Sequence, residues 1–336
     1  MPSQNHMMKS ILVTGGAGFI GSHLVDLLMA QDLNVVVLDA LTYAGSKDNL
    51  ETHFNKPNFH FVEGNICDGE LVSDLLARHT IDTVLHLAAE SHVDNAIEEP
   101  GIFIKTNVEG SYTLLKACLD AWQNTDGKRF LHVSTDEVFG QLKENDPPFN
   151  EETSYAPSSP YSASKASSDL LARAWHHTYK FPVVITNCSN NYGSRQHDEK
   201  LIPTIIRNAL AGKIIPIYGT GMNIRDWLYV EDHCKGLIAA ITQGALGETY
   251  CLGGDNEVKN LDIARQICGI LDKKIPKANG KSYAEQIQFV TDRKGHDFRY
   301  AIDFSKAKSK IGWTPQIDFQ TGLEKTVDHY IRLYKG

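Results

Sequence analysis

Residues Thr14–Gly21 read TGGAGFIG, and this stretch decides the fold of the 336-residue chain. It follows an apolar run, Ser10–Thr14, that predicts a first β-strand, and it opens a stretch with helical periodicity, Gly18–Ala30. The glycines satisfy G-x-G-x-x-G counted from Gly16 and G-x-x-G-x-x-G counted from Gly15. Glycine-rich turns are common, but between a strand and a helix this spacing predicts a dinucleotide site, because a pyrophosphate can approach the helix N-terminus closely.

The rest of the N-terminal half alternates β-branched runs with helical stretches. Alternation of this kind predicts an α/β fold with a doubly wound parallel (Rossmann) sheet. The further predicted strands are Asn34–Asp39, Phe59–Glu63, Thr83–Leu87, Phe130–Ser134 and Val183–Asn187, and the further predicted helices include Asp68–Arg78 and Asn107–Trp122.

The regular alternation of strands and helices ends after about Cys188, where Asn190–Arg195 is polar and predicts a turn. We therefore expect a Rossmann domain over residues 8–188, with a returning segment near 225–255, and a smaller substrate domain in most of 189–336. The elements predicted there are helices Pro203–Ala211 and Glu231–Gln243, strands Ile214–Tyr218, Arg225–Val230 and Glu248–Leu252, and two or three helices after Asn260.

Composition excludes several classes of protein. The net charge of -8 and the pI of about 5.9 argue against nucleic-acid binding, which needs basic patches. No apolar run is long enough to span a bilayer, and residues 1–9 do not read as a signal peptide. The six cysteines include no C-x-x-C pair, so we expect free thiols, no metal site and a cytoplasmic location.

Asp39 closes the second predicted strand, eighteen residues after Gly21. A carboxylate at this place accepts hydrogen bonds from ribose hydroxyls and repels a 2′-phosphate, which favours NAD over NADP. The alternative, that Asp39 merely ends a strand, ranks lower because of the glycine motif.

Tyr161 and Lys165 are four residues apart, so on a helix they lie one turn apart on one face. A lysine charge stabilises a phenolate, and we expect Lys165 to lower the pKa of Tyr161. A phenolate can take a proton from an alcohol while hydride leaves for a nicotinamide. Y-x-x-x-K is frequent by chance, but behind a dinucleotide motif it predicts a catalytic pair.

Two adjacent acids, Asp136 and Glu137, follow the strand Phe130–Ser134. Ligands in parallel sheets bind at the carboxyl ends of strands, and buried acids are costly unless they have partners or a function. The alternative is a surface turn, but Val138 and Phe139 follow directly. An acid and a base beside Tyr161 suggest oxidation, loss of water and return of the hydride, a redox-neutral dehydration.

Segments along nearly the whole chain resemble the dTDP-D-glucose 4,6-dehydratase family of extended short-chain dehydrogenase/reductases. Ser134–Val138 is the most specific of them, since related epimerases and decarboxylases share the glycine motif and the Tyr/Lys pair but lack the full Thr-Asp-Glu triplet. The segments are Leu12–Gly21 (LVTGGAGFIG), Leu41–Gly45 (LTYAG), His86–Asp94 (HLAAESHVD), Ser134–Val138 (STDEV), Tyr155–Asp169 (YAPSSPYSASKASSD), Thr186–Gly193 (TNCSNNYG), Glu199–Pro203 (EKLIP), Arg225–His233 (RDWLYVEDH) and Gly295–Asp303 (GHDFRYAID).

The resemblance implies an NAD-dependent lyase that acts on a nucleotide-sugar, dTDP-D-glucose, and forms a homodimer through helices such as Asn107–Trp122 and Pro160–Tyr179. It implies that Tyr161 and Thr135 meet the C4 oxygen, that Lys165 holds the nicotinamide ribose, that Glu137 takes the C5 proton and that Asp136 protonates the C6 hydroxyl. The implied cofactor residues are Gly15, Gly18, Phe19, Ile20, Gly21, Asp39, Leu41, Thr42, Asn65, Ile66, Leu87, Ala88, Ala89, Ser91, Thr106, Ser134, Tyr161, Lys165 and Asn191. The implied substrate residues are Ser91, Thr135, Asn190, Lys200, Leu201, Pro216, Tyr218, Arg225, Asn260, Arg293 and His296.

The chain departs from the family pattern at Asn65, Ala40, Phe139 and Ser194–Asp198 (SRQHD). The last departure lies near the expected substrate lid and bears on the preferred sugar or base. Two other readings remain: a 4-epimerase or decarboxylase on the same scaffold, and a catalytically silent NAD-binding sensor. Asp136 and Glu137 argue against the first, and the presence of Tyr161, Lys165 and both acids argues against the second.

Overall fold

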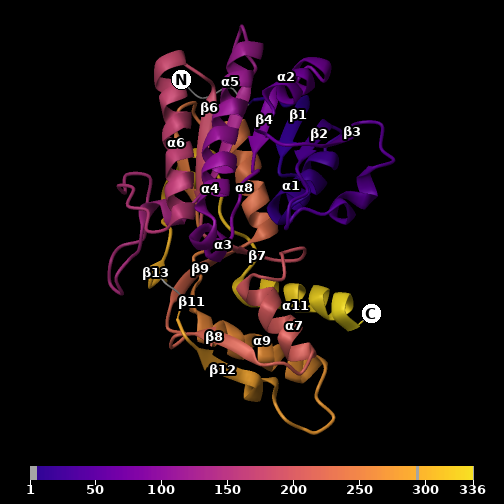
Figure 1. Ribbon diagram of the computed structural model, residues 1–336, viewed down its shortest axis with the longest axis vertical. Coiled ribbons are helices and arrows are strands. Elements are labelled where there is room, and N and C mark those ends of the chain that lie inside the picture. Colours follow the sequence, from indigo (N-terminus) through magenta and orange to yellow (C-terminus); the bar gives the residue numbers. More distant parts are fainter. Residues whose placement is uncertain (1–5, 293–294, 336) are drawn as a thin grey trace.

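The computed structural model describes residues 6–292 and 295–335 and is built on a seven-stranded parallel sheet (Figure 1). The spatial order is β3-β2-β1-β4-β5-β6-β10, and every neighbouring pair is parallel. This confirms the predicted doubly wound sheet. The strands are β1 (Ser10–Thr14), β2 (Asn34–Asp39), β3 (Phe59–Glu63), β4 (Thr83–His86), β5 (Arg129–Thr135), β6 (Val183–Cys188) and β10 (Thr249–Leu252).

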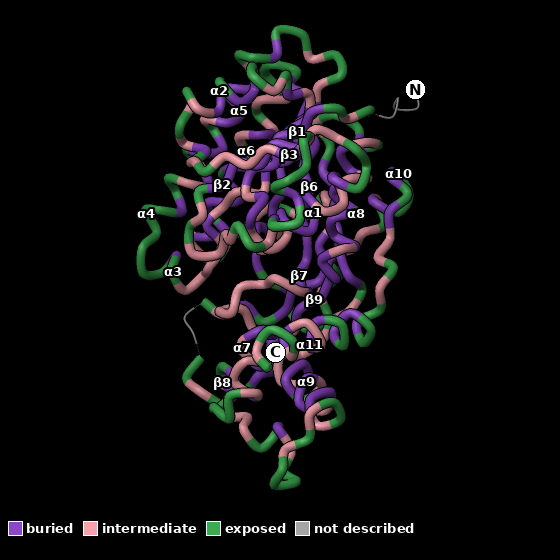
Figure 2. The backbone as a smooth tube through the Cα atoms, turned by 90° about the vertical axis from the view of Figure 1, so that its right-hand side faces the viewer, coloured by how far each residue is buried: buried purple, intermediate pink, exposed green. Residues whose placement is uncertain are grey.

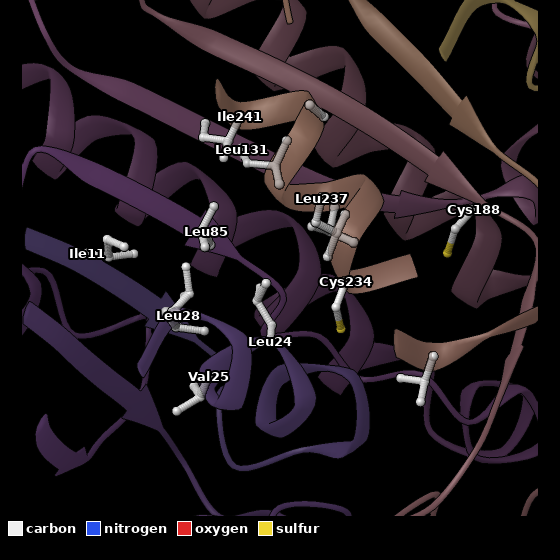
Figure 3. Close-up of a cluster of buried hydrophobic side chains, with 14 of the residues drawn as sticks. Ile11, Leu24, Val25, Leu28, Leu85, Leu131, Cys188, Cys234, Leu237 and Ile241 are labelled. Carbon is white, nitrogen blue, oxygen red and sulfur yellow. The ribbon is translucent and has the colours of Figure 1, made fainter. Parts of the chain in front are cut away.

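Helices cover both faces of the sheet because its central strands are apolar on both sides. On one face Leu24 and Leu28 of α1 and Leu237 of α8 pack with Leu85 and Leu131 of the strands (Figure 3). On the other face α2, α5 and α6 form a second core around Phe130. The helices are α1 (Phe19–Met29), α2 (Gly69–Arg78), α5 (Ser111–Ala121), α6 (Pro160–Tyr179) and α8 (Val230–Gln243).

Short helices connect these elements near the carboxyl ends of the strands. One of them, a π-helix at Ile104–Gly110, continues into α5 and buries Asn107. The others are α3 (Val93–Glu98), α4 (Pro100–Phe103) and the 3-10 helices Lys47–His53 and Asp136–Phe139, whereas a further 3-10 helix, Tyr283–Gln286, belongs to the C-terminal part.

The C-terminal part has a core of its own, in the lower half of Figure 1. Strand β9 pairs with β7, β11 and β13, and β8 pairs with β12. The elements are β7 (Asn190–Tyr192), α7 (Leu201–Leu210), β8 (Ile215–Tyr218), β9 (Ile224–Tyr229), β11 (Glu257–Lys259), α9 (Asn260–Lys274), β12 (Ile287–Val290), β13 (Arg299–Tyr300) and α11 (Phe319–Lys335).

The chain returns from this part to the first sheet twice. Helix α8 and strand β10 return within the predicted segment 225–255, whereas β9, at the start of that segment, pairs in the second sheet. Helix α10 (Ser305–Ile311) returns again, and Ala307 and Trp313 pack in the core with α8. The predicted division near residue 188 stays a prediction.

None of the helices in the described ranges 6–292 and 295–335 is both long enough and apolar enough to cross a membrane. The six cysteines are all free thiols. Five of them are buried, and Cys67 is partly exposed.

Candidate active site

One cleft runs along the carboxyl ends of β1, β2, β4, β5 and β6, where the order of strands reverses and ligands of such sheets bind. Its lining includes every predicted catalytic residue and every predicted cofactor residue except Leu41. The lining residues are Gly15, Gly18, Phe19, Ile20, Gly21, Leu38, Asp39, Ala40, Thr42, Ala44, Gly45, Gly64, Asn65, Ile66, Leu87, Ala88, Ala89, Glu90, Ser91, Thr106, Val133, Ser134, Thr135, Asp136, Glu137, Tyr161, Lys165, Cys188, Ser189, Asn190, Asn191, Gln196, His197, Glu199 and Lys200.

The glycine turn forms one wall of the cleft because larger residues do not fit there. Gly15 has φ +72°, and a Cβ on it would lie 2.7 Å from the Ala88 nitrogen. A Cβ on Gly21 would lie 2.1 Å from the Gly15 oxygen. No side chain caps the N-terminus of α1 at Gly18, so its first N–H groups can receive an anionic ligand.

Asp39 lies at the end of β2, almost fully buried, and its carboxylate faces the same turn. Oδ2 accepts from the Ala17 N–H at 2.9 Å and Oδ1 from the Leu41 N–H at 2.8 Å. Burial raises the pKa of Asp39 more than these two bonds lower it. Each carboxylate oxygen keeps acceptor capacity for a ribose hydroxyl.

The acids occupy the 3-10 turn after β5. Thr135 Oγ1 caps this turn by accepting from the Glu137 N–H at 3.3 Å, and it donates to Asp136 Oδ1 at 3.3 Å. Asp136 is 2% exposed. Burial, followed by the charges of Glu137 and Asp226, raises its pKa well above the usual range. The raised pKa favours the protonated form of the Asp136 carboxyl, which can donate its proton.

Tyr161 and Lys165 come from the first turns of α6, which Pro160 and a capping box between Ser159 and Ser162 begin. Lys165 Nζ donates to the Val133 carbonyl at 2.8 Å. Burial, together with the nearby acids Glu137 and Asp136 and the thiol of Cys188, raises the pKa of Tyr161 well above its usual value.

The expected lowering of the Tyr161 pKa by Lys165 is therefore wrong for the chain by itself. Lys165 is itself buried, and burial lowers its pKa. The physical reason is that removing a phenolate from water costs more than one partly desolvated cation offsets.

The rim of the cleft near α7 carries charged and aromatic groups. Lys200 Nζ donates to the Ser91 carbonyl at 3.1 Å, and Glu199 lies within ion-pair distance of Lys200 and of His92 and His197. The ring of His197 packs edge-on against Tyr43, 5.6 Å between centroids. His197 lies in the segment 194–198 that departs from the family pattern, so this departure forms part of the cleft wall.

Sequence reasoning missed several lining residues, including Glu90, Gln196, His197 and Glu199. Glu90 and Glu199 lie inside the motifs HLAAESHVD and EKLIP, so the motifs themselves carried the signal. Gln196 and His197 lie in the departing segment, where no pattern could identify them.

The predicted substrate residues divide into two sets. Ser91, Thr135, Asn190 and Lys200 line the cleft, whereas Leu201, Pro216, Tyr218, Arg225, Asn260 and His296 do not. Arg293 lies outside the described residues. The second set belongs to the C-terminal part, where Tyr218 and His296 contact each other edge-on, 6.4 Å between ring centroids.

Arg225 is 5% exposed, and backbone carbonyls occupy much of its guanidinium. It donates to the carbonyls of Asp297 at 2.9 Å and Phe298 at 3.3 Å and stacks over the Tyr300 ring. Its charge acts on Asp136 by lowering the pKa of that carboxyl. Arg225 is therefore close enough to the acidic turn for its charge to act on Asp136.

The cleft fits a dinucleotide and a polar substrate. The buried polar atoms that border it without a hydrogen-bond partner in the described part of the chain include Asp136 Oδ2, Asn190 Oδ1 and Asn191 Oδ1. Buried polar atoms are normally paired, so these atoms suit a ligand. No group of His, Cys, Asp and Glu side chains within 6–292 and 295–335 is suited to a metal.

Comparisons with known proteins agree with this geometry. A family model described as GDP-mannose 4,6 dehydratase matches residues 12–326. A dTDP-glucose 4,6-dehydratase of Xanthomonas campestris pv. campestris (strain B100) is 52% identical over 329 residues, which cover 96% of this chain and 93% of the relative.

Solved structures show the same fold. A dTDP-glucose 4,6-dehydratase from Bacillus anthracis in complex with NAD matches with a TM-score of 0.87 and 40% identity, covering 97% of this chain and 98% of that one. A UDP-glucose 4-epimerase from Thermotoga maritima with UDP-glucose matches with a TM-score of 0.86 and 29% identity, covering 96% and 99%. The fold alone does not separate these two activities, so the side chains of the cleft must.

Proposed function

Because this chain belongs to the GDP-mannose 4,6 dehydratase family, we propose that it is an NAD-dependent lyase that converts dTDP-D-glucose to dTDP-4-keto-6-deoxy-D-glucose. The observation that carries the proposal is the Thr135–Glu137 turn, which lines one cleft together with Tyr161, Lys165 and the glycine turn. A 4-epimerase needs only the residues for oxidation, which are Tyr161, Lys165 and the glycine turn. The two acids supply what an elimination needs in addition.

NAD fits the half of the cleft formed by β1, β2 and β4, and when bound it supplies the hydride acceptor. Gly15, Gly18 and Gly21 allow its pyrophosphate to approach α1, and Asp39 would accept from its adenosine ribose. The remaining predicted cofactor residues line the same half, apart from Leu41, whose N–H instead holds the Asp39 carboxylate.

Oxidation at C4 begins the reaction. Tyr161, as a phenolate, takes the C4 hydroxyl proton as the C4–H hydride leaves, and the Thr135 hydroxyl binds the same oxygen. Because the pKa of Tyr161 is raised in the chain by itself, this role needs the positive charge that the nicotinamide of NAD⁺ would supply nearby. Lys165 is held at the Val133 carbonyl, from where it would orient the nicotinamide ribose. The new ketone makes the C5–H acidic, so the next step needs a base and an acid.

Elimination across C5–C6 follows. Glu137 takes the C5 proton, the C6–O bond breaks, and Asp136 gives its proton to the departing hydroxyl, so that water leaves and a C5=C6 double bond forms. The high pKa of Asp136 suits this role, since the acid must arrive protonated. The hydride then returns to C6 and a proton to C5, which leaves the cofactor unchanged.

The substrate spans the two parts of the chain. Ser91, Asn190 and Lys200 lie in the cleft at the end nearest α7 and would bind the sugar and diphosphate. The more distant set, Leu201, Pro216, Tyr218, Asn260 and His296, would receive the nucleoside, with Arg225 and Arg293 nearest the diphosphate. This assignment rests on the family resemblance for each residue.

The protein acts as a homodimer in this proposal. Exposed apolar side chains lie on four neighbouring segments, α3, residues 100–110, α5 and α6, and the tube of Figure 2 is green around α3 and α4. Exposed apolar side chains gathered on neighbouring segments suit an interface. These side chains are Ile97, Ile102, Ile104, Tyr112, Leu170 and Tyr179.

Light scattering coupled to size exclusion tests the dimer. Leu170→Glu places a charge at the centre of the patch and should give a monomer. Leu333 on α11 is 60% exposed against 58% for Leu170, so Leu333→Glu is a matched control that should stay dimeric. We also expect the free thiols to be kept in the reducing cytoplasm.

Product analysis tests the activity. Incubation with dTDP-D-glucose and no added cofactor should give a nucleotide-sugar lighter by one water, identified by mass spectrometry and by the methyl signal of C6 in NMR. UDP-, GDP- and CDP-glucose in parallel reactions test the base. A product of unchanged mass and inverted C4 would instead identify an epimerase. If none of the nucleotide-sugars gave a product, the catalytically silent NAD-binding sensor would be favoured.

A further inference from the structure

Asp169 is a fully buried carboxylate that the reaction described above does not use. It lies on α6, one helical turn beyond Lys165 and two beyond Tyr161, with no exposed surface. Its Oδ1 accepts from His132 Nε2 at 3.0 Å, and its Oδ2 accepts from the Tyr155 hydroxyl at 2.9 Å. A buried charge is expensive without such partners. This carboxylate therefore holds a network in place behind the cleft.

The carboxylate of Asp169 is ionised. Burial raises its pKa, but the hydrogen bond from His132 and the charges around it, including that of Lys165, reverse this effect and leave the pKa below its usual value. Burial lowers the pKa of His132, so its ring is neutral at pH 7. Because a carboxylate only accepts, the ring proton resides on Nε2.

Lys165 depends on this negative charge. Burial lowers the pKa of Lys165, and Asp169 and the Cys188 thiol on β6 act in the opposite direction. The other ionisable groups that interact with Lys165 are His86 on β4 and His132 on β5, both buried, and the pKa of each is lowered by burial and by the lysine charge. Asp169 is thus the counter-charge that favours the protonated form of Lys165.

The same carboxylate is joined to the acidic turn through one amide. Asn187 on β6 donates from Nδ2 to Asp169 Oδ2 at 3.3 Å and also to the Thr135 carbonyl at 3.0 Å. Thr135 precedes Asp136 and caps the turn that presents both acids. Movement at Asp169 would therefore change the direction in which the acids point.

We propose that Asp169 is a positioning residue that serves both halves of the reaction: it supplies the counter-charge of Lys165 for oxidation, and through Asn187 it fixes the Thr135–Glu137 turn for elimination. This inference rests on the proposed function and deepens it. One buried carboxylate then couples the Tyr/Lys pair on α6 to the acids after β5.

Asp169→Asn tests the first half, because it removes the charge and keeps the shape. Rapid mixing of the holoenzyme with dTDP-D-glucose should show NADH absorbance forming during oxidation, followed over a range of pH. In a plot of this rate against pH, the fall in rate at high pH (the high-pH limb) should begin about one pH unit lower in the variant, because Lys165 loses its proton at a lower pH. Tyr155→Phe removes one hydrogen bond to Asp169 but not its charge, and should leave that limb in place.

Asn187→Ser tests the second half, because it shortens the side chain that joins Asp169 to Thr135. Oxidation should keep its wild-type pH limb, while bound NADH decays at least about tenfold more slowly as elimination stalls. An Asp169→Asn enzyme with a wild-type pH limb, or an Asn187→Ser enzyme with normal NADH decay, would overturn the corresponding half. If Asp169→Asn does not fold, as circular dichroism would show, Asn187→Ser still decides the second half, and Asp169→Ser, which also removes the charge, takes its place in the pH measurement for the first half. Failure of the proposed function is distinct, since the wild type would then form no nucleotide-sugar lighter by one water.

Discussion

The charge of Glu137 raises the pKa of its neighbour Asp136, adding to the larger effect of burial. The two acids occupy the same turn, but Asp136 is 2% exposed and Glu137 is partly exposed. Adjacent carboxyls in different surroundings can hold different protonation states, which allows one to act as acid and the other as base.

Asp136→Asn should therefore separate stability from activity. The folded-state pKa of Asp136 is raised, so the folded state keeps a proton that the unfolded state releases, and wild-type stability falls as pH rises toward that pKa. The variant has no such group, so its Tm in calorimetry should fall less as pH rises above about 4, the pKa of an unfolded aspartate, while dehydration drops strongly. Parallel Tm curves for the two proteins would show that Asp136 is ionised in the fold.

Tyr161→Phe should nearly abolish oxidation, by roughly 10²–10⁴ in rate, because it removes the proton acceptor and barely changes volume. Its Tm should stay close to that of the wild type, since the Tyr161 hydroxyl makes no hydrogen bond to another element within residues 6–292 and 295–335. Stopped-flow NADH absorbance measures the step directly. Tyr155→Phe, with the same chemical change elsewhere in the fold, is the control. Wild-type NADH formation in Tyr161→Phe would show that another group takes the C4 proton.

Asp39→Ala should weaken NAD binding and relax discrimination against NADP, since the carboxylate would accept from the ribose and repel a 2′-phosphate. Titration calorimetry of cofactor-free protein with both dinucleotides measures the ratio. Some stability should also be lost, because the Ala17 and Leu41 N–H groups lose their acceptor. Asp48→Ala, an exposed acid in the following 3-10 helix, should leave the ratio unchanged. Equal affinity of the wild type for NAD and NADP would contradict the role of Asp39.

Arg225→Lys keeps the charge and loses the planar fork. If Arg225 serves diphosphate binding, KM should rise with little change in kcat, because uniform binding is lost. The bonds from its guanidinium to the Asp297 and Phe298 carbonyls predict an additional loss of about 1–2 kcal/mol in the free energy of unfolding. Steady-state kinetics and urea unfolding measure the two effects. A defect in kcat alone would place Arg225 with the acidic turn rather than with the substrate anchor.

Much of this fold could be predicted because its strongest signals are local. The strands Ser10–Thr14, Asn34–Asp39 and Phe59–Glu63 have the predicted bounds, since each is an apolar run between breaking residues. The glycine turn and the Tyr/Lys pair likewise depend on short spacings. These features needed no knowledge of distant contacts.

What could not be predicted depends on contacts between distant residues. Asn190–Tyr192 was expected in a polar turn, yet it is strand β7, because it pairs in parallel with β9, about 37 residues further along the chain. The high pKa of Tyr161 arises from burial and from Asp136 and Glu137, which no spacing within α6 reveals. Nor could a sequence pattern place Asp169 beside Asn187.

Isotope labels test the mechanism as a whole. If oxidation, elimination and reduction occur in one site, the hydride removed from C4 must return to C6, so substrate with deuterium at C4 should give product with deuterium in its methyl group. In heavy water, unlabelled substrate should gain one deuterium at C5, since Glu137 exchanges its proton with solvent. NMR and mass spectrometry of the product measure both positions.

The two acids should then separate by mutation. Glu137→Gln cannot take the C5 proton, so NADH absorbance should build up on the enzyme and no C5 exchange should occur. Asp136→Asn lacks the acid for the C6 hydroxyl, so elimination should slow while C5 exchange continues, because enolisation needs only the base. Each variant therefore serves as a control for the other, because the two acids lie in the same turn of the chain. A C4 label that stays at C4 after turnover, with oxygen retained at C6, would reject the dehydratase assignment.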